Sequence, residues 1–352
     1  MTTRHCDVRE DHVLIRSTPD ADLGTVEIVL FATVVAADDV KDCRGRHGVR
    51  KWYHGPSGLA RGAASPSGRV LRYDCRVATT YQRPRHHHHY VRIPVGNDPR
   101  YARLDVVATS GAERLLLYDR APWLGGKPTG EALNEVPAGR LAPVEPSKII
   151  GIGSNYRAHC AEMNKPVPKE PLLFMKPPSS LTGPDTAIVR PPGYERTDFE
   201  GELGVVIGKR AYRVSAADAL SYVFGYTIVN DVSVRDLQKR DGQFTRAKGF
   251  DTFCPVGPVV VATGSDTSID PNNLTLRTRH NGEVRQDSNT SDMVFDVPTL
   301  VSFISQVMTL EPGDLIATGT PSGVSPIEPG DRIEIEIEHI GILANPVIER
   351  AW

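Results

Sequence analysis

The sequence predicts an α+β fold that is mostly β, and three observations support this prediction. Its 352 residues include 31 Gly and 28 Pro, a content that favours many turns and short strands over long helices. Apolar runs of strand length recur from Lys148 onward. Segments with the spacing of an amphipathic helix are few. At ~100–200 residues per domain, the length allows two or three domains.

The composition is that of a soluble enzyme and argues against several other classes of protein. Because 41 Lys+Arg nearly balance 43 Asp+Glu, the net charge of −2 gives no overall attraction for nucleic acid. The longest apolar run, Ile28–Ala37, is about half the ~20 residues needed to span a membrane. The N-terminus lacks the apolar stretch of a secretory signal, and five Cys without framework spacing suit a reducing compartment. We therefore expect a cytoplasmic protein with no membrane or nucleic-acid partner.

Residues 1–89 are predicted to be a disordered or non-native basic extension. Between Cys43 and His89, ten basic residues accompany a single acid, Asp74, and turn-forming residues interrupt any periodicity. Such a segment buries too little apolar surface to offset the entropy of ordering it. Two alternatives are a basic arm for an anionic surface and metal capture by His86–His89. A further hypothesis is that translation begins near Val91.

The predicted elements after residue 89 fall into two segments. Residues 90–145 are expected to form a small β-rich domain with strands at Tyr101–Val107 and Arg114–Tyr118, followed by a proline-containing extended connection. Within residues 146–352, Asn281-Gly282 predicts a hairpin, because this pair tolerates the positive φ of a type I′ turn. Strands are expected there at Ile149–Ile152, Leu203–Ile207, Tyr226–Val229, Val256–Ala262, Leu274–Arg279, Asp314–Thr318 and Arg332–Ile337. Helices are expected at Tyr156–Asn164, Ala216–Ser221, Val234–Arg240 and Val297–Val307.

Two acidic motifs lie at the ends of predicted strands. Glu200 and Glu202 are two residues apart on a strand and therefore point to the same side. Asp231 ends the next apolar run, where it can cap the following helix or reach a ligand. Three carboxylates without a paired His or Cys are hard oxygen donors, which select Mg²⁺, Mn²⁺ or Ca²⁺ over zinc. The simpler alternatives are an exposed polar strand end and a capping Asp.

Helical spacing pairs four further polar residues. His159 and Glu162 are three residues apart, so Glu162 can orient the imidazole as a general base, although a solvent-facing His beside a Glu is the simpler alternative. Arg235 and Gln238 share a helical face, where they can hold an anionic group or remain solvated. Lys248 lies among small and apolar residues, where its ammonium can stabilise a developing enolate oxygen.

Two glycine-containing motifs have different expected roles. Thr318-Gly-Thr320-Pro-Ser-Gly follows an apolar strand and is typical of a tight anion-holding loop, to which Thr320 contributes a hydroxyl. Ile149-Ile-Gly151-Ile-Gly153 begins like a dinucleotide-binding fingerprint, but the third glycine and the ribose-binding acid are absent. We therefore do not expect a nicotinamide cofactor.

Six ordered motifs between Lys148 and Glu338 resemble the fumarylacetoacetate hydrolase family. They are Gly153-Ser-Asn-Tyr-Arg-Ala-His159-Cys-Ala-Glu162, Phe174-Met-Lys176-Pro, Glu200-Gly-Glu202-Leu-Gly, Asn230-Asp231-Val-Ser-Val-Arg235-Asp-Leu-Gln238, Ala247-Lys248-Gly-Phe-Asp and Thr318-Gly-Thr320-Pro-Ser-Gly-Val. The resemblance implies a mixed β-roll, usually dimeric, for a metal-dependent catalytic domain at residues 146–352. It also implies a small β-rich N-terminal domain ahead of it.

The resemblance further implies a role for each motif residue. Mg²⁺ or Mn²⁺, for which Ca²⁺ can substitute, is expected to be held by Glu200, Glu202 and Asp231. The expected catalytic residues are His159, Glu162 and Lys248. The expected substrate contacts are Arg235, Gln238, Thr320 and Lys176.

The favoured hypothesis is hydrolysis of a C–C bond in a small 2,4-dioxo acid of the acylpyruvate or fumarylpyruvate type. Water deprotonated by His159 would attack the 4-carbonyl carbon, and cleavage would leave an enolate stabilised by the cation and Lys248. The same enolate serves isomerisation of a 2-hydroxy-diene-dioate or decarboxylation of the 2-oxo acid oxaloacetate, as in aromatic-compound catabolism, and both are alternatives. An inactive binding protein that retains the fold is an alternative of another class.

Overall fold

A computed structural model describes two parts of the chain. The backbone is described at residues 4–8, 11–15 and 32–33, and the structure then describes residues 88–350 apart from 97, 107–112, 138 and 265–268. The basic segment 43–87, on which the predicted extension depends, lies outside the described residues.

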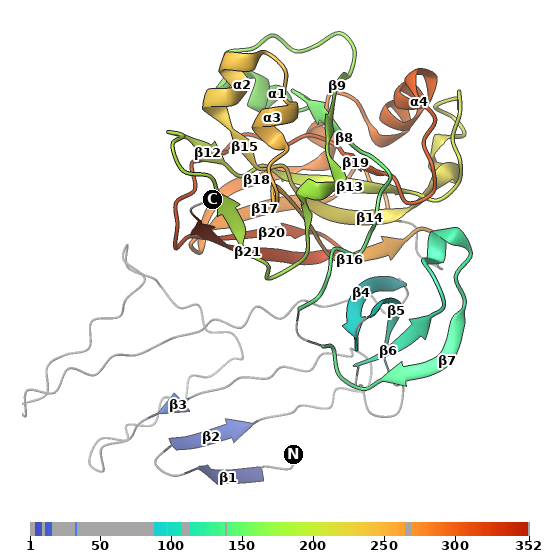
Figure 1. The fold of residues 1–352 in the computed structure, drawn as a ribbon, viewed down its shortest axis with the longest axis vertical. Helices are drawn as coiled ribbons and strands as arrows, with labels where there is room; N and C mark the ends of the chain where they lie inside the picture. The colour runs from blue at the N-terminus through green and yellow to red at the C-terminus, as the bar shows by residue number, and fades with distance from the viewer. Residues whose placement is uncertain are drawn as a thin grey trace, which may run out of the picture. The chain divides into compact units, whose positions relative to one another are not determined.

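Contacts divide the chain into two compact units, Met1–Gln82 and Arg83–Trp352. The first unit contributes a three-stranded antiparallel sheet of β1 (Arg4–Val8), β2 (Asp11–Ile15) and β3 (Ala32–Thr33). All other described elements belong to the second unit, which confirms the mostly β fold (Figure 1).

An eleven-stranded mixed sheet dominates the second unit (Figure 1). Its central strand β13 (Gly201–Ile207) is buried along its whole length, because apolar side chains pack against both of its faces. The short β10 (Leu181–Thr182) pairs with β16 and lies off the main path. That path runs β7 (Pro128–Leu133), β6 (Glu113–Tyr118), β5 (Asp98–Val106), β4 (His89–Val95), β16 (Cys254–Ala262), β14 (Val223–Asn230), β13, β19 (Leu315–Ala317), β8 (Ile149–Gly153) and β9 (Leu172–Lys176).

A five-stranded sheet packs against one face of this large sheet. Its order is β11 (Ile188–Arg190), β21 (Gly341–Glu349), β20 (Arg332–Ile337), β17 (Thr275–His280) and β18 (Glu283–Asn289). Strand β13 contacts β17, and β14 contacts β20 and β21. The main core lies between these strands, with Leu203 and Ile228 from the large sheet against Leu276, Ile335 and Ile337.

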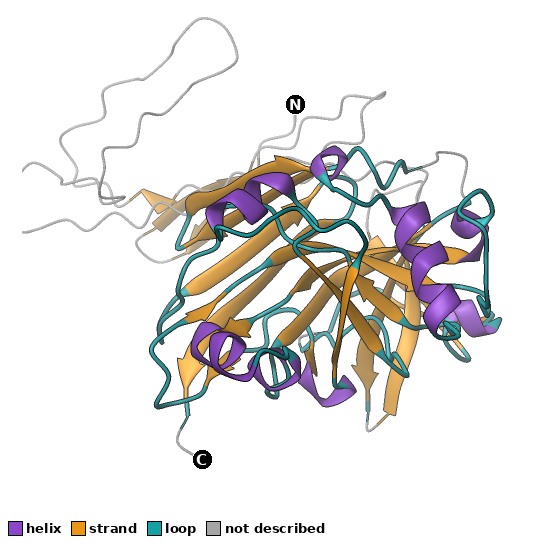
Figure 2. Cartoon of the chain, turned by 90° about the horizontal axis from the view of Figure 1, so that it is seen from above, coloured by secondary structure: helices purple, strands orange, loops and turns teal. Residues whose placement is uncertain are grey.

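Helices are short and lie at the margins of the sheets (Figure 2). They are α1 (Arg157–Glu162), α2 (Arg235–Asp241), α3 (Thr245–Lys248) and α4 (Val297–Val307). The observed bounds of α4 agree with the prediction. The helix begins there because Asp296 accepts a hydrogen bond from Thr299 N and Pro298 occupies the first turn. No described helix is long and apolar enough to cross a membrane.

All seven strands predicted within residues 146–352 are present, with bounds shifted by up to three residues. The Asn281-Gly282 hairpin is confirmed between β17 and β18, with φ values of 53° and 84°. Two expectations about helices differ from the structure. The helix expected at Ala216–Ser221 is a shorter 3₁₀ helix at Ala219–Tyr222. Of the two roles considered for Asp231, helix capping is not realised, because β15 (Ser233–Val234) intervenes and α2 starts at Arg235.

Residues 90–145 are β-rich, and their strands continue the large sheet. Tyr90 on β4 pairs with Val260 on β16. Backbone hydrogen bonds therefore join residues 90–145 to the strands of residues 146–352. Aromatic rings reinforce the junction: Tyr90 and Trp123 both pack against Phe224, with ring centroids 5.6 Å and 5.4 Å apart.

Candidate metal centre and active site

Three buried carboxylates meet where the start of β13 lies beside the end of β14. The two strands are antiparallel, and Gly201 is paired with Asn230. This register places Glu200 and Glu202, on either side of Gly201, close to Asp231. One ligand oxygen from each carboxylate lies within 4.8 Å of the others. The structure therefore brings together the three predicted metal ligands in a geometry that could hold a metal ion.

Two lysines and an arginine surround two of these carboxylates. Lys248 Nζ donates to Glu200 Oε2 at 2.7 Å and to Asp231 Oδ2 at 2.5 Å. Lys176 Nζ donates to the other oxygen of Asp231 at 2.6 Å. Arg235 Nη2 donates to Glu200 Oε1 at 2.6 Å. Glu202 forms no ion pair with a described residue and accepts one backbone hydrogen bond, from Gly319 N at 2.9 Å.

This unequal distribution of charge shifts the pKa values of the two glutamates in opposite directions. Burial raises the pKa of Glu202, and the charges of Asp231 and Glu200 raise it further, to well above the ordinary value. Burial also disfavours ionised Glu200, but Lys248 and Arg235 outweigh it and hold the pKa of that carboxyl below its usual range. A divalent cation beside Glu202 would supply the missing positive charge, so the residues present fit a bound metal.

The loop after β19 holds one of these carboxylates in place. Gly319 has a φ of 97°, and its N–H donates to Glu202 Oε2. A Cβ at Gly319 would lie 2.7 Å from the Cβ of Asn155. The side-chain Nδ2 of Asn155 donates a hydrogen bond to Thr318 O at 2.7 Å. Thr320 donates to Gly201 O at 2.9 Å. The sequence predicted that this loop holds an anion. The anion that the loop contacts is the Glu202 carboxylate of the protein itself.

His159 and Glu162 form the predicted pair on α1. His159 Nδ1 and Glu162 Oε2 are 2.9 Å apart, and the second carboxylate oxygen accepts a hydrogen bond from Gly323 N at 2.9 Å. Glu162 therefore links α1 to the loop after β19. Because the contact with Glu162 occupies Nδ1, Nε2 is the ring nitrogen left for a ligand.

Arg235 and Gln238 lie on one face of α2, as predicted, and contact each other. Arg235 Nη1 donates to Gln238 Oε1 at 2.9 Å, and Nε donates to Asp198 Oδ2 at 2.8 Å. With Nη2 on Glu200, each of its three nitrogens contacts a protein acceptor. The guanidinium thus orients protein groups at the site, and its role as a substrate contact stays a prediction.

A cavity that is partly open to solvent is lined by most of the predicted residues. Lys176 is completely buried and is absent from the lining, because its ammonium contacts Asp231 and the carbonyl of Lys248. The lining residues are Ile152, Gly153, Ser154, His159, Met163, Lys165, Phe174, Glu200, Glu202, Arg235, Gln238, Phe244, Lys248 and Thr320.

Sequence reasoning missed Gln286, a buried residue that supports the site from β18. Its Oε1 accepts hydrogen bonds from Gly201 N at 3.1 Å and Thr278 Oγ1 at 2.7 Å. Its Nε2 donates to Thr320 Oγ1 at 2.7 Å and Pro321 O at 2.9 Å. One amide therefore connects the residue between the two glutamates to the loop that holds Glu202.

Comparison with known proteins agrees with this geometry. Residues 148–348 match the sequence model described as "Fumarylacetoacetate (FAA) hydrolase C-terminal". The chain belongs to the fumarylacetoacetate hydrolase family. Members of this family are enzymes that act on small molecules, typically use divalent metals and are commonly oligomeric.

Three relatives indicate which activities occur among similar members. The structure named 2-hydroxyhepta-2,4-diene-1,7-dioate isomerase, from Mycobacterium marinum, is 43% identical, with a TM-score of 0.67 over 75% of this chain and 100% of that chain. The structure named 5-carboxymethyl-2-hydroxymuconate delta-isomerase, from Mycobacterium smegmatis, is 41% identical, with a TM-score of 0.67 over 74% and 100%. The mitochondrial oxaloacetate tautomerase of Rattus norvegicus is 46% identical over 59% of this chain and 69% of the relative.

Proposed function

We propose that the protein is a divalent-metal-dependent enzyme that moves a proton between the keto and enol forms of a small 2-oxo acid. The observation that carries the proposal is one cavity lined by Glu200, Glu202, the Lys248 ammonium and the His159 imidazole, with Asp231 beside the two glutamates. Relatives named as isomerases and a tautomerase support proton transfer ahead of C–C bond hydrolysis.

Glu200, Glu202 and Asp231 are the residues that would hold the metal. Three carboxylate oxygens suit Mg²⁺ or Mn²⁺, and Ca²⁺ can substitute because it accepts the same donors with looser geometry. When bound, such an ion supplies Lewis-acid polarisation of the oxygen of a 2-oxo group.

The protein's own residues would transfer the proton. His159 Nε2 would accept a proton from the carbon beside the 2-oxo group, and the C–H electron pair would form the new C=C bond. Glu162 would stabilise the imidazolium through Nδ1. The Lys248 ammonium would lie near the negative charge that develops on the substrate oxygen. Return of the proton to oxygen or to another carbon gives a tautomer or an isomer.

Hydrolysis of a 2,4-dioxo acid is the second candidate. The His159–Glu162 pair favours it, because an oriented imidazole can deprotonate a water molecule as well as a carbon acid. Decarboxylation passes through the same enol form and is an alternative product outcome. The proposals of a homodimer and of a cytoplasmic location rest on the family and the composition.

Proton transfer can be tested in heavy water. Oxaloacetate, other 2-oxo acids and 2,4-dioxo acids are incubated with the protein in Mg²⁺ or in EDTA, and NMR follows deuterium uptake beside the 2-oxo group and the products formed. We expect Mg²⁺-dependent exchange faster than the buffer rate and no C–C cleavage. Cleavage products without excess exchange would favour hydrolysis, and neither exchange nor products would contradict an enzymatic role.

A further inference from the structure

The cavity has an aromatic wall with a lysine at each end. The inner lysine, Lys248, lies 4.8 Å from the Phe174 ring centroid. Phe174 packs edge-on against Phe244 at 5.6 Å, and Lys165 Nζ lies 5.8 Å from the Phe244 centroid. All four residues line the cavity. A ligand bound there would contact apolar rings between two cationic groups.

The glycines of β8 make room for this wall. A Cβ at Gly151 would lie 2.1 Å from Cζ of Phe174, so a side chain at this position would displace the ring. A Cβ at Gly153 would lie 3.0 Å from Leu172 and 3.6 Å from Phe244. The Gly-x-Gly motif that resembles part of a dinucleotide fingerprint therefore allows close packing of the aromatic side chains here.

The two lysines differ in how their charge is balanced. Lys248 donates to Glu200 and Asp231, and Arg235, the other inner cation of the cavity, donates to Glu200 and Asp198. Lys165 forms no ion pair with a described residue. Among the described residues that line the cavity, Lys165 is thus the cation whose charge is left for a ligand.

The backbone of Lys165 is fixed by the end of α1. Asn164 adopts a φ of 52°, and its N–H donates to Ala161 O at 3.1 Å. Lys165 N donates to Cys160 O at 2.8 Å. These two bonds form a Schellman motif, which ends the helix. The motif places Lys165, the residue after the left-handed Asn164, at the cavity.

We propose that Lys165 is the specificity-determining residue that binds the distal carboxylate of a 2-oxo dicarboxylate, with Phe174 and Phe244 against its carbon chain. The inference rests on the proposed function for the reacting end of the molecule. That end would lie at the carboxylate cluster, and the far carboxylate would reach the ammonium at the mouth of the cavity. A monocarboxylate of equal chain length would have no group for Lys165.

The test compares acids that differ at the distal end. Oxaloacetate and longer 2-oxo dicarboxylates are paired with 2-oxo monocarboxylates of the same chain length, and deuterium exchange gives KM and kcat. Lys165→Gln should raise KM for the dicarboxylate about tenfold, the size expected for loss of one charge-assisted hydrogen bond, and should leave kcat nearly unchanged. The monocarboxylate should be unaffected, and Lys165→Arg should restore most of the affinity.

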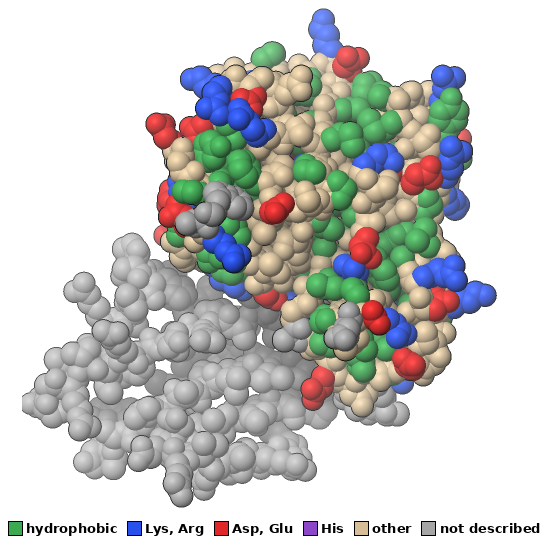
Figure 3. All heavy atoms as spheres, in the orientation of Figure 1, with side chains coloured by type: hydrophobic (Ala, Val, Ile, Leu, Met, Phe, Trp, Pro, Cys, Tyr) green, Lys and Arg blue, Asp and Glu red, His purple; other side chains and the backbone are tan. Residues whose placement is uncertain are grey.

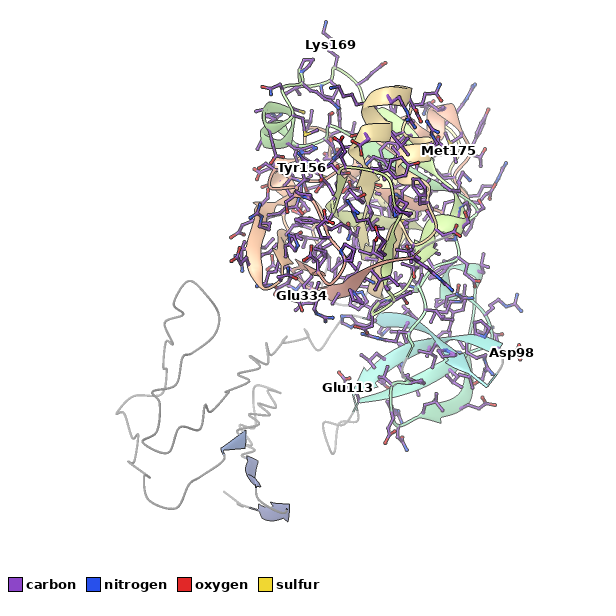
Figure 4. All side chains as sticks on the ribbon, turned by 60° about the vertical axis from the view of Figure 1, so that its left-hand side comes forward. Asp98, Glu113, Tyr156, Lys169, Met175 and Glu334 are labelled. Carbon is purple, nitrogen blue, oxygen red and sulfur yellow. The ribbon has the colours of Figure 1, made fainter. Side chains whose placement is uncertain are left out.

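The segment between α1 and β9, which contains Lys165, also offers a matched control. Lys169 is exposed, does not line the cavity and projects away from the molecule in Figure 4, so Lys169→Gln should change neither substrate. Equal effects of Lys165→Gln on both acids, or no effect on either, would overturn the proposal.

Calorimetry separates this proposal from the proposed function. If the wild-type protein exchanges no 2-oxo acid, the proposed function fails, and the same acid pairs are titrated into the Mg²⁺-loaded full chain. Tighter binding of the dicarboxylate that is lost in Lys165→Gln would still support the role of Lys165. Equal binding of the two acids by the wild-type protein would contradict it.

Discussion

Glu202 differs from its two neighbouring carboxylates in forming no ion pair with a described residue. Glu200 and Asp231 each contact at least one ammonium or guanidinium group, whereas Glu202 accepts a hydrogen bond from a backbone N–H. Its raised pKa follows from this arrangement, because burial and two nearby negative charges all oppose ionisation. A proton and a bound metal ion would therefore compete for the same carboxylate.

This competition predicts that metal binding releases a proton. Because the pKa of Glu202 is raised in the folded metal-free protein, that protein loses stability as pH rises above the ordinary carboxyl value. The ion should therefore stabilise the fold more at higher pH, and its affinity should fall as pH falls. Calorimetric titration with Mn²⁺ in buffers of different ionisation enthalpy measures the proton release. An affinity independent of pH would count against the competition.

The general-base assignment predicts a large loss of rate on removal of the imidazole. His159→Ala or Glu162→Gln should lower kcat by about 10²–10⁴-fold, the usual contribution of an oriented general base. Steady-state exchange rates at saturating substrate provide the measurement. Arg157→Ala, at an exposed position of the same helix, is the matched control. Full activity in both variants would refute the assignment.

Spacing predicted the residues of the site better than it predicted their contacts. Glu200 and Glu202 could be paired because a strand places alternate side chains on one side. Gln286 carries no comparable signal, because a single glutamine in a polar strand is ordinary until the fold surrounds it. The partners of Lys176 likewise depend on the neighbouring end of β14, which lies far away in the sequence.

At the scale of elements, the site depends on contacts between β18, β13 and the loop after β19. Gln286 joins all three through Gly201 and Thr320. Gln286→Leu removes these hydrogen bonds and leaves buried polar partners unsatisfied. Each such group costs about 1–3 kcal/mol.

We therefore expect Gln286→Leu to lower Tm and to weaken metal binding by about tenfold, since the glutamates on both sides of Gly201 lose their support. Thermal unfolding and Mn²⁺ calorimetry measure the two effects. Gln306→Leu, at an exposed position of α4, is the control and should preserve the affinity. An unchanged affinity in Gln286→Leu would show that Gln286 does not position the ligands.

Elements were predictable where their apolar pattern is continuous. Strands β13, β14 and β16 are buried on both faces, and their uninterrupted apolar runs identified them. Strand β21, which pairs with both β20 and β11, was not predicted, and it contains Pro346, a residue that disfavours strand interiors. The pattern at Ala216–Ser221 did not specify the type of helix, because six residues cannot distinguish an α-helix from a 3₁₀ turn.

At the scale of the whole molecule, the order of strands was beyond prediction. Strand β4 pairs with β16, about 170 residues later, and no local pattern specifies such a partner. Charge was predictable: basic and acidic side chains are interspersed over the face shown in Figure 3, in keeping with the near-neutral total.

The division of contacts predicts where the chain can be shortened. Deleting residues 1–82 should leave Tm and exchange activity unchanged, because the unit that contains the site starts at Arg83. Deleting residues 1–96 removes β4 and exposes the edge of β16, so it should lower Tm markedly. Calorimetry of the two variants measures the difference. A shorter deletion as damaging as the longer one would contradict this boundary.

The most direct test of the central claim is a titration of the metal-free protein with Mn²⁺, followed by electron paramagnetic resonance. We predict one tightly bound ion per chain, lost in Glu200→Gln, Glu202→Gln and Asp231→Asn and retained in Glu195→Gln, which alters an exposed acid. A folded wild-type protein that binds no ion, or triad variants that bind it as tightly as the wild type, would contradict the account.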